Sequence, residues 1–157
     1  MTELMLLDSL KKELSNLVKE YDLNTKNNIK TAPSVYEGYL PIKNKDTKEE
    51  SGYPFIILRL IECEDNTESI AKIKIIIGTY DESAESNGWK DVLNIYNKVK
   101  IFLIENPIIE KKFIFKEKIK FNLPEEQPYP YFIGEMITEW QMPKVIKIYN
   151  LNEEDGY

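Results

Sequence analysis

The chain has 157 residues, of which 42% are hydrophobic and 31% charged, and its formal net charge at pH 7 is −6. This length is typical of one globular domain, and the acidic balance argues against a protein that grips nucleic acid through a basic surface. The chain has one cysteine and no histidine, which excludes an internal disulfide and every Ser-His or Cys-His catalytic pair.

The first part of the chain predicts an amphipathic helix over residues 3–21, with Thr2 placed to cap it. The acids of this stretch do not fit a signal peptide, so we expect a cytosolic start. No apolar run approaches the ~18 residues of a membrane span. The predicted apolar stripe consists of Leu4, Leu7, Leu10, Leu14, Leu17, Val18 and Tyr21.

The middle of the chain predicts three strands. SVYEGYLPI, residues 34–42, predicts a short strand at an edge, because Pro41 cannot continue a ladder. The runs FIILRLIEC, from Phe55, and SIAKIKIIIGTYD, to Asp81, are typical of a β-hairpin. Cys63 lies in the first run among acids that disfavour a thiolate, and we expect a small, half-buried strand residue there.

A second helix and two more strands are predicted after this hairpin. The helix begins at Asn87 or Gly88 and is stopped by Pro107, and Trp89 in its first turn is expected to anchor it against a sheet. KFIFKEKIKFNLP, residues 112–124, alternates apolar and basic residues, and YPYFIGEMITEWQMP, residues 129–143, predicts the last long strand.

The order of these elements predicts the fold class. Helix, strand, hairpin, helix, strand, strand is not the βαβα alternation of a doubly wound sheet. We expect an α+β fold, with two helices packed on one face of a mostly antiparallel sheet of four to five strands. Residues 1–145 are expected to form a single domain, and residues 146–157 to extend the last strand or form a tail.

Two groups of carboxylates are candidates for chemistry. Glu125, Glu126 and Glu135 suggest a two-carboxylate glycosidase, but adjacent acids do not set the gap that such an enzyme needs, and a solvated loop is favoured. A second group, Asp81, Glu82 and Glu85, precedes the second helix and complements its N-terminus. A divalent cation is the alternative there, although the spacing of a calcium loop is absent. We expect no catalytic residue, no bound metal and no cofactor.

The stretch EEQPYPYFIGEMITEW, residues 125–140, has the composition of an interface. Its prolines stiffen the approach to the strand, and its aromatic side chains offer large contact area. Gly134 predicts either a bulge or a close backbone approach, and Trp140 is expected in the core. The polar segment 43–52 is a second candidate surface. The predicted interface residues are Lys45, Lys48, Glu50, Tyr129, Tyr131 and Phe132.

Two segments together carry a family resemblance. IKIIIGTYDESAESNGWKDVLNIYNKVKIFL, residues 73–103, is a strand that ends in G-T-Y-D, followed by an acidic link and a helix opened by G-W-K-D-V-L-N. The other segment is EEQPYPYFIGEMITEWQMP, residues 125–143. In this order and separation they resemble the tail terminator, or tail completion, proteins of phages and prophages of Gram-positive bacteria. The resemblance extends over residues 1–145.

This resemblance implies a structural role in the virion tail, without catalysis or cofactor. Such proteins assemble in the host cytoplasm as a ring, usually a hexamer, on the head-proximal end of the tail tube. The ring ends tube polymerisation and joins the tube to a neck or head–tail connector protein, away from any membrane. DNA would pass without specific binding. Asp81, Glu82 and Glu85 are candidates for acids that face the lumen, and solvated positions on the outside of the ring are the alternative for them. Another neck or connector protein and a non-viral protein-binding module remain the alternatives.

Overall fold

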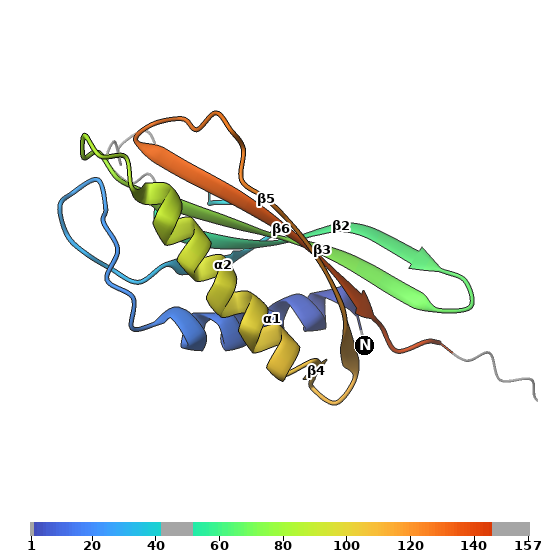
Figure 1. Cartoon of the computed structure of the whole chain (residues 1–157). Coiled ribbons are helices and arrows are strands. Elements are labelled where there is room, and N and C mark those ends of the chain that lie inside the picture. Colours follow the sequence, from blue (N-terminus) through green and yellow to red (C-terminus); the bar gives the residue numbers. More distant parts are fainter. Residues whose placement is uncertain (1, 42–51, 146–157) are drawn as a thin grey trace, which may run out of the picture.

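The computed structural model describes residues 2–41 and 52–145. Lys45, Lys48 and Glu50, together with the C-terminal segment 146–157, lie outside the described residues. Figure 1 shows two helices and a curled sheet. The elements in chain order are α1 (Glu3–Val18), β1 (Ser34–Glu37), β2 (Phe55–Asp65), β3 (Ser69–Tyr80), α2 (Gly88–Glu105), β4 (Ile108–Ile109), β5 (Phe113–Asn122) and β6 (Tyr131–Gln141).

The described strands form one six-stranded sheet in the order β1-β2-β3-β6-β5-β4. β1 runs parallel to β2, and all the other neighbouring pairs are antiparallel. The α+β class and the mostly antiparallel sheet are therefore confirmed. The expected count of four to five strands was too low because β4 has two residues, which is too short to leave an alternating pattern in the sequence.

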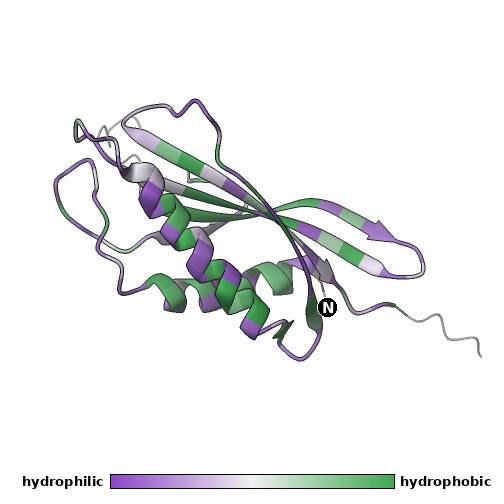
Figure 2. Cartoon of the chain, viewed as in Figure 1, coloured by the Kyte–Doolittle hydropathy of each residue, from purple (hydrophilic) through white to green (hydrophobic). Residues whose placement is uncertain are grey.

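Both helices pack on the same side of the sheet and enclose the main core (Figure 1). In Figure 2, hydrophobic and hydrophilic residues alternate along the strands, as expected where one face of a sheet packs against helices, and Phe55, Ile57 and Ile76 form a second, smaller buried cluster outside this core. No helix of the described residues is long and apolar enough to cross a membrane. The helix residues fully buried in this core are Leu6, Leu10, Leu14, Val18, Val92, Ile95, Val99 and Leu103.

The first helix confirms the predicted cap and corrects the predicted length. The Thr2 hydroxyl accepts a hydrogen bond from the Met5 amide, 3.4 Å away, as an N-cap residue does. The helix ends at Val18 rather than at residue 21. Leu4, which the predicted stripe included, is 71% exposed, whereas Leu6, which the stripe did not include, is fully buried. The core-facing stripe is therefore rotated slightly around the helix axis.

The second helix begins and ends where the sequence predicts, but a different residue holds its first turn against the sheet. Gly88 opens α2, and Glu105 ends it two residues before Pro107. The expectation for Trp89 was wrong, since its side chain is 39% exposed. A Cβ atom on Gly88 would lie 2.3 Å from Cδ2 of Phe132, so the helix meets β6 through the bare backbone of Gly88.

Gly134 in the middle of β6 marks a second close approach. The register of β3 and β6 runs without a break from Ile70↔Gln141 to Tyr80↔Tyr131, so the glycine is not at a bulge between these strands. A Cβ atom at Gly134 would lie 2.6 Å from Cγ1 of Val92. Of the two sequence alternatives, the close approach is therefore the correct one, and it brings α2 onto the centre of the sheet.

A buried polar chain lies beneath the helices on β6. The indole N–H of Trp140 donates to the Thr138 hydroxyl oxygen at 2.9 Å, and that hydroxyl donates to the Ile73 carbonyl oxygen, also at 2.9 Å. Trp140 and Thr138 are fully buried, which confirms the core position expected for Trp140. Each polar atom has a partner, so the chain can stabilise one arrangement of β3 and β6.

Replacing Thr138 with valine keeps the side-chain shape but removes the hydroxyl. We expect Thr138→Val to lower the free energy of unfolding by about 1–3 kcal/mol, because the indole N–H is left buried without an acceptor. Urea unfolding measures the change. The control is the same substitution in a Trp140→Phe background, where no N–H remains to be satisfied and the loss should be smaller. Equal losses in both backgrounds would contradict the role given to this hydrogen bond.

Candidate functional site

One end of the sheet gathers loops that are distant in the sequence. The loop 81–87 joins β3 to α2, the loop 123–130 joins β5 to β6, and both lie at the same end of the molecule (Figure 1). Tyr53, just before β2, reaches the same place through its ring contact with Tyr131. We call this region the loop end, defined by residues 53–54, 80–87 and 123–131.

Four tyrosines form the centre of the loop end, and we call them the tyrosine cluster: Tyr53, Tyr80, Tyr129 and Tyr131. The ring centroid of Tyr131 lies 4.6 Å from that of Tyr53 and 5.5 Å from that of Tyr80. Tyr129 is tied to the loop 81–87, because its hydroxyl donates a hydrogen bond to the backbone carbonyl of Glu82. The cluster therefore connects both loops with the start of β2.

The sheet itself places this cluster. β3 and β6 remain paired up to Tyr80↔Tyr131, and the Asp81 amide then donates to the Pro130 carbonyl oxygen at 2.9 Å. The two loops therefore leave the sheet from adjacent positions. The Tyr80 hydroxyl donates to a carboxylate oxygen of Glu82 at 2.7 Å, which holds the first turn of the loop against the cluster.

Asp81 fixes the shape of the loop from within. It is 7% exposed, and its two carboxylate oxygens accept hydrogen bonds from the Ser83 amide at 2.9 Å and the Asn87 amide at 2.7 Å. Burial by itself would raise the pKa of this carboxyl, but the bonds from Ser83 and Asn87 outweigh burial and hold the pKa below its ordinary value. The charged carboxylate thus holds the backbone of Asn87, the residue that precedes α2, in place.

Two phenol groups of the cluster, those of Tyr80 and Tyr53, have raised pKa values. The hydrogen bond to Glu82, and then burial, raises the pKa of Tyr80 to about 12. Burial, and then the neighbouring Tyr131, raises the pKa of Tyr53. Groups that hold their protons in this way donate hydrogen bonds and do not accept a proton as a general base. The arrangement suits contact with another surface.

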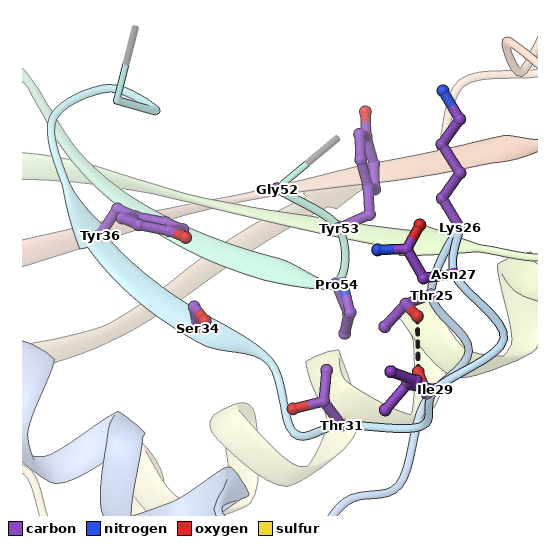
Figure 3. A pocket seen from close by; sticks show the side chains of 10 residues that line it. All are labelled: Thr25, Lys26, Asn27, Ile29, Thr31, Ser34, Tyr36, Gly52, Tyr53 and Pro54. Atoms are coloured by element: carbon purple, nitrogen blue, oxygen red, sulfur yellow. Dashed lines mark hydrogen bonds between the residues drawn. The ribbon is translucent and has the colours of Figure 1, made fainter. Parts of the chain in front are cut away.

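Three shallow hollows surround the loop end. The one in Figure 3, of about 320 Å³, lies between the turn at residues 25–31, β1 and Tyr53, and Lys26 is the charged residue among its described lining residues. The Thr25 hydroxyl donates to the Ile29 carbonyl and shapes its rim (Figure 3). The other two, of about 260 and 400 Å³, flank loop 81–87 on either side. The hollow of about 260 Å³ is lined by Lys30 as well as by Asp81 and Glu82.

The interface residues predicted from the sequence differ in their exposure to solvent. Tyr129 is 54% exposed and Tyr131 is partly exposed, and both belong to the tyrosine cluster. Phe132 is only 5% exposed and packs beneath Gly88, so its side chain is part of the core. The sequence pattern alternates at these positions but does not say which of them faces the helices.

The structure also separates the predicted acids. Glu82 and Glu85 are exposed, whereas Asp81 is buried. Among residues 2–41 and 52–145, no group of three or more Asp, Glu, Cys or His side chains is placed to hold a metal ion.

The carboxylates considered for a glycosidase are dispersed. Glu125 and Glu126 are exposed in the loop before β6, whereas Glu135 lies within β6, where its carboxylate is 3.5 Å from the Lys74 ammonium. Cys63 lies in β2 as expected, but it is exposed rather than half-buried. Partial burial of its sulfur, and then the nearby Glu3 carboxylate, raises the pKa of the thiol.

Two members of the tyrosine cluster were missed by sequence reasoning. Tyr53 precedes Pro54 at the end of a polar segment, and Tyr80 is the last residue of β3 before Asp81. Their positions at strand ends were a usable signal, because strand ends place side chains beside loops. Their contacts with Tyr131 depend on the pairing of β3 with β2 and β6, which no local pattern specifies.

No model of a known protein family matches this chain, and no curated protein matches it either.

Asp81→Asn tests the two hydrogen bonds that the Asp81 carboxylate accepts from the Ser83 and Asn87 amides. We expect it to lower the free energy of unfolding by about 1–2 kcal/mol at pH 7, since the amide cannot accept both backbone hydrogen bonds. The pKa of Asp81 is lowered by folding. Its stabilisation is therefore complete above the unfolded value of about 3.9 and is lost as the pH falls through the lower folded value. The difference between wild type and variant should shrink at pH 3 and below.

Urea unfolding at pH 7 and pH 3 measures this difference. Glu85→Gln is the matched control, because Glu85 is exposed and accepts only the side-chain amide of Asn87, at 3.1 Å. It should change the free energy of unfolding by less than about 0.5 kcal/mol. A loss of unfolding free energy in Asp81→Asn that stays constant down to pH 2 would contradict a stabilising role of the charged Asp81 carboxylate.

Proposed function

We propose that this protein is a phage tail terminator, a structural protein that forms a ring on the head-proximal end of a tail tube. The ring ends tube polymerisation and presents the surface that joins the tail to a connector or neck protein. Its place is the virion tail, after assembly in the cytoplasm of a bacterial host. A hexamer is the proposed assembly, because that is the usual form in the family that the sequence resembles.

One observation supports this proposal above the others. The two segments that carry the resemblance, residues 73–103 and 125–143, pack into a single unit. β3 from the first pairs along its whole length with β6 from the second. α2 then lies over β6, through the close approaches at Gly88 and Gly134. Residues that look like one family's pattern in the sequence are thus neighbours in space.

The chemistry of the loop end is consistent with a contact role. Its exposed part includes the aromatic ring of Tyr129 beside the carboxylates of Glu82 and Glu85, and an aromatic ring gives large contact area at low cost in side-chain entropy. Tyr129 protrudes from this end while its hydroxyl is held by the Glu82 carbonyl. Such a preorganised aromatic residue is a good anchor for a partner surface, and we assign it to the tube protein or to the neighbouring subunit.

The acidity of the chain suits the passage of DNA. A lumen lined with carboxylates repels phosphate and so opposes adhesion. Of the three acids proposed for this role, Glu82 and Glu85 are exposed, and the Asp81 charge is taken up by backbone amides. We therefore propose Glu82 and Glu85 as the lumen-facing acids of this loop.

The test of the proposed function uses tail tubes sheared from phage particles and tubes polymerised from tube protein. Adding this protein during polymerisation should shorten the tubes in proportion to the amount added, and electron microscopy should show density at one tube end only. An unrelated acidic protein of similar size is the control. Unchanged tube lengths and bare ends would reject the proposal, and binding to a connector but not to tubes would point to a neck protein.

Tyr129→Ala tests the loop end as the contact surface. We expect it to weaken end binding by about 10-fold or more, as the loss of an aromatic anchor does. Tyr129→Phe is the matched control, because it keeps the ring and removes only the hydrogen bond to Glu82. End occupancy counted over a concentration series gives the affinities. Equal occupancy for wild type and Tyr129→Ala would place the contact elsewhere on the molecule.

A further inference from the structure

The sheet has two edges that its short outer strands leave uncovered. β1 pairs with β2 only from Phe55 to Leu58, and β4 pairs with β5 only at Phe113 and Ile114. Beyond these positions, β2 from residue 59 to 65 and β5 from residue 115 to 122 have no second neighbour among the described strands. An uncovered strand edge presents free backbone donors and acceptors.

The two uncovered edges carry opposite charge. The β2 edge has three acids, Glu62, Glu64 and Asp65, against one arginine. The β5 edge has three lysines against one glutamate. The lysines are Lys116, Lys118 and Lys120, and all three are exposed.

Glu62, Glu64 and the three lysines lie on the face of the sheet that the helices leave open. Ile73 is buried under the helices, so Lys72 beside it points to the opposite face. The Lys72 ammonium is 3.2 Å from the Glu62 carboxylate and 3.7 Å from that of Glu139, and Glu139 is in turn 3.6 Å from the Lys118 ammonium. Glu62 and Lys118 therefore belong to the same face, at opposite margins of the sheet.

We propose that these edges join copies of the chain head to tail, with β2 of one subunit pairing with β5 of the next. Three antiparallel pairings separate β2 from β5 within the sheet, so the two strands run in opposite directions. A second copy placed beside the first in the same orientation brings its β5 antiparallel to β2. Edge pairing then satisfies backbone groups of both strands and places acids and lysines on one face.

Charge makes this pairing selective. β2 against β2 would set acids opposite acids, and β5 against β5 would set lysines opposite lysines, which is unfavourable in both cases. Lysines and the bulge between Phe115 and Ile119 are devices that keep strand edges from pairing at random. The lysines oppose a like edge and favour an acidic one. Exposed apolar side chains at the β2 edge, Leu60 and Ile61, would lose contact with water in the joined sheet.

A head-to-tail contact repeated by rotation either closes into a ring or extends as a filament. The closed form rests on the proposed function, which needs a ring at the tube end. The contact between β2 and β5 follows from the strand edges and their charges, and it can be tested separately from tube capping.

Charge reversal at each edge provides the test. One variant carries Glu62→Lys and Glu64→Lys, and the other carries Lys118→Glu and Lys120→Glu. These side chains are exposed and their ion pairs contribute little to folding, so both variants should give the circular dichroism of the wild type. Sedimentation should show each variant alone associating at least 10-fold more weakly than wild type, because its two edges now have the same charge.

Mixing the two variants gives the decisive result. Each edge of one variant is complementary to an edge of the other, so the equimolar mixture should recover association to near the wild-type level. Raising the salt concentration should weaken association of the wild type, since exposed charges are screened. A mixture that remains monomeric while the wild type associates would overturn the proposal.

Cross-linking covers the case in which subunits meet only on the tube. A mixture of ¹⁴N- and ¹⁵N-labelled wild type is treated with a zero-length carbodiimide, in solution and on sheared tail tubes. Mixed-isotope peptides joining residues 62 or 64 to 118 or 120 are expected, and the same-isotope link between Lys72 and Glu62 is the internal control. Absence of the mixed peptides in both samples overturns the contact, even where capping is observed. Mixed peptides without capping leave the contact standing and reject the terminator role.

Discussion

The pairing of β3 with β6 is the constraint on which the rest of this structure depends. It joins strands separated in the chain by a helix and two strands, and it runs from Ile70↔Gln141 to Tyr80↔Tyr131 without a register shift. Near the middle of β6, Gly134 leaves room for Val92 of α2. At one end of the pairing, the loop 81–87 follows β3 and the loop 123–130 precedes β6. A slip of one residue would turn every side chain of β6 to the other face and expose the buried Trp140.

Hydrogen bonds within the chain hold the loop end in one shape. The buried Asp81 carboxylate accepts two backbone amides, and the Glu82 carbonyl and carboxylate accept the hydroxyls of Tyr129 and Tyr80. These bonds tie loop 81–87 both to the start of α2 and to the loop before β6. An ordered surface loses less conformational entropy when it meets a partner, which would favour the contact that we propose for the loop end.

Charge is distributed over this protein by face and by edge. The side of the sheet under the helices is apolar, and the open side carries a connected set of ion pairs that includes Lys72, Glu139 and Lys118. The margins of the sheet differ in sign, although the whole chain is acidic. In the proposed ring, these differences have separate purposes. Opposite margins join neighbours, and the acidic surplus opposes adhesion of DNA.

The sequence by itself determined the elements whose evidence is local. Periodicity gave both helices and the alternation of Ile73, Ile75 and Ile77, because one buried face imposes a period of 3.6 or 2 on neighbouring residues. Only the tertiary structure decided that β1 runs parallel to β2, that Trp89 lies outside the core and that Gly134 faces α2. Those outcomes depend on which distant segments meet. The tyrosine cluster and the two uncovered edges have the same origin, since a strand has an open edge only in relation to its neighbours.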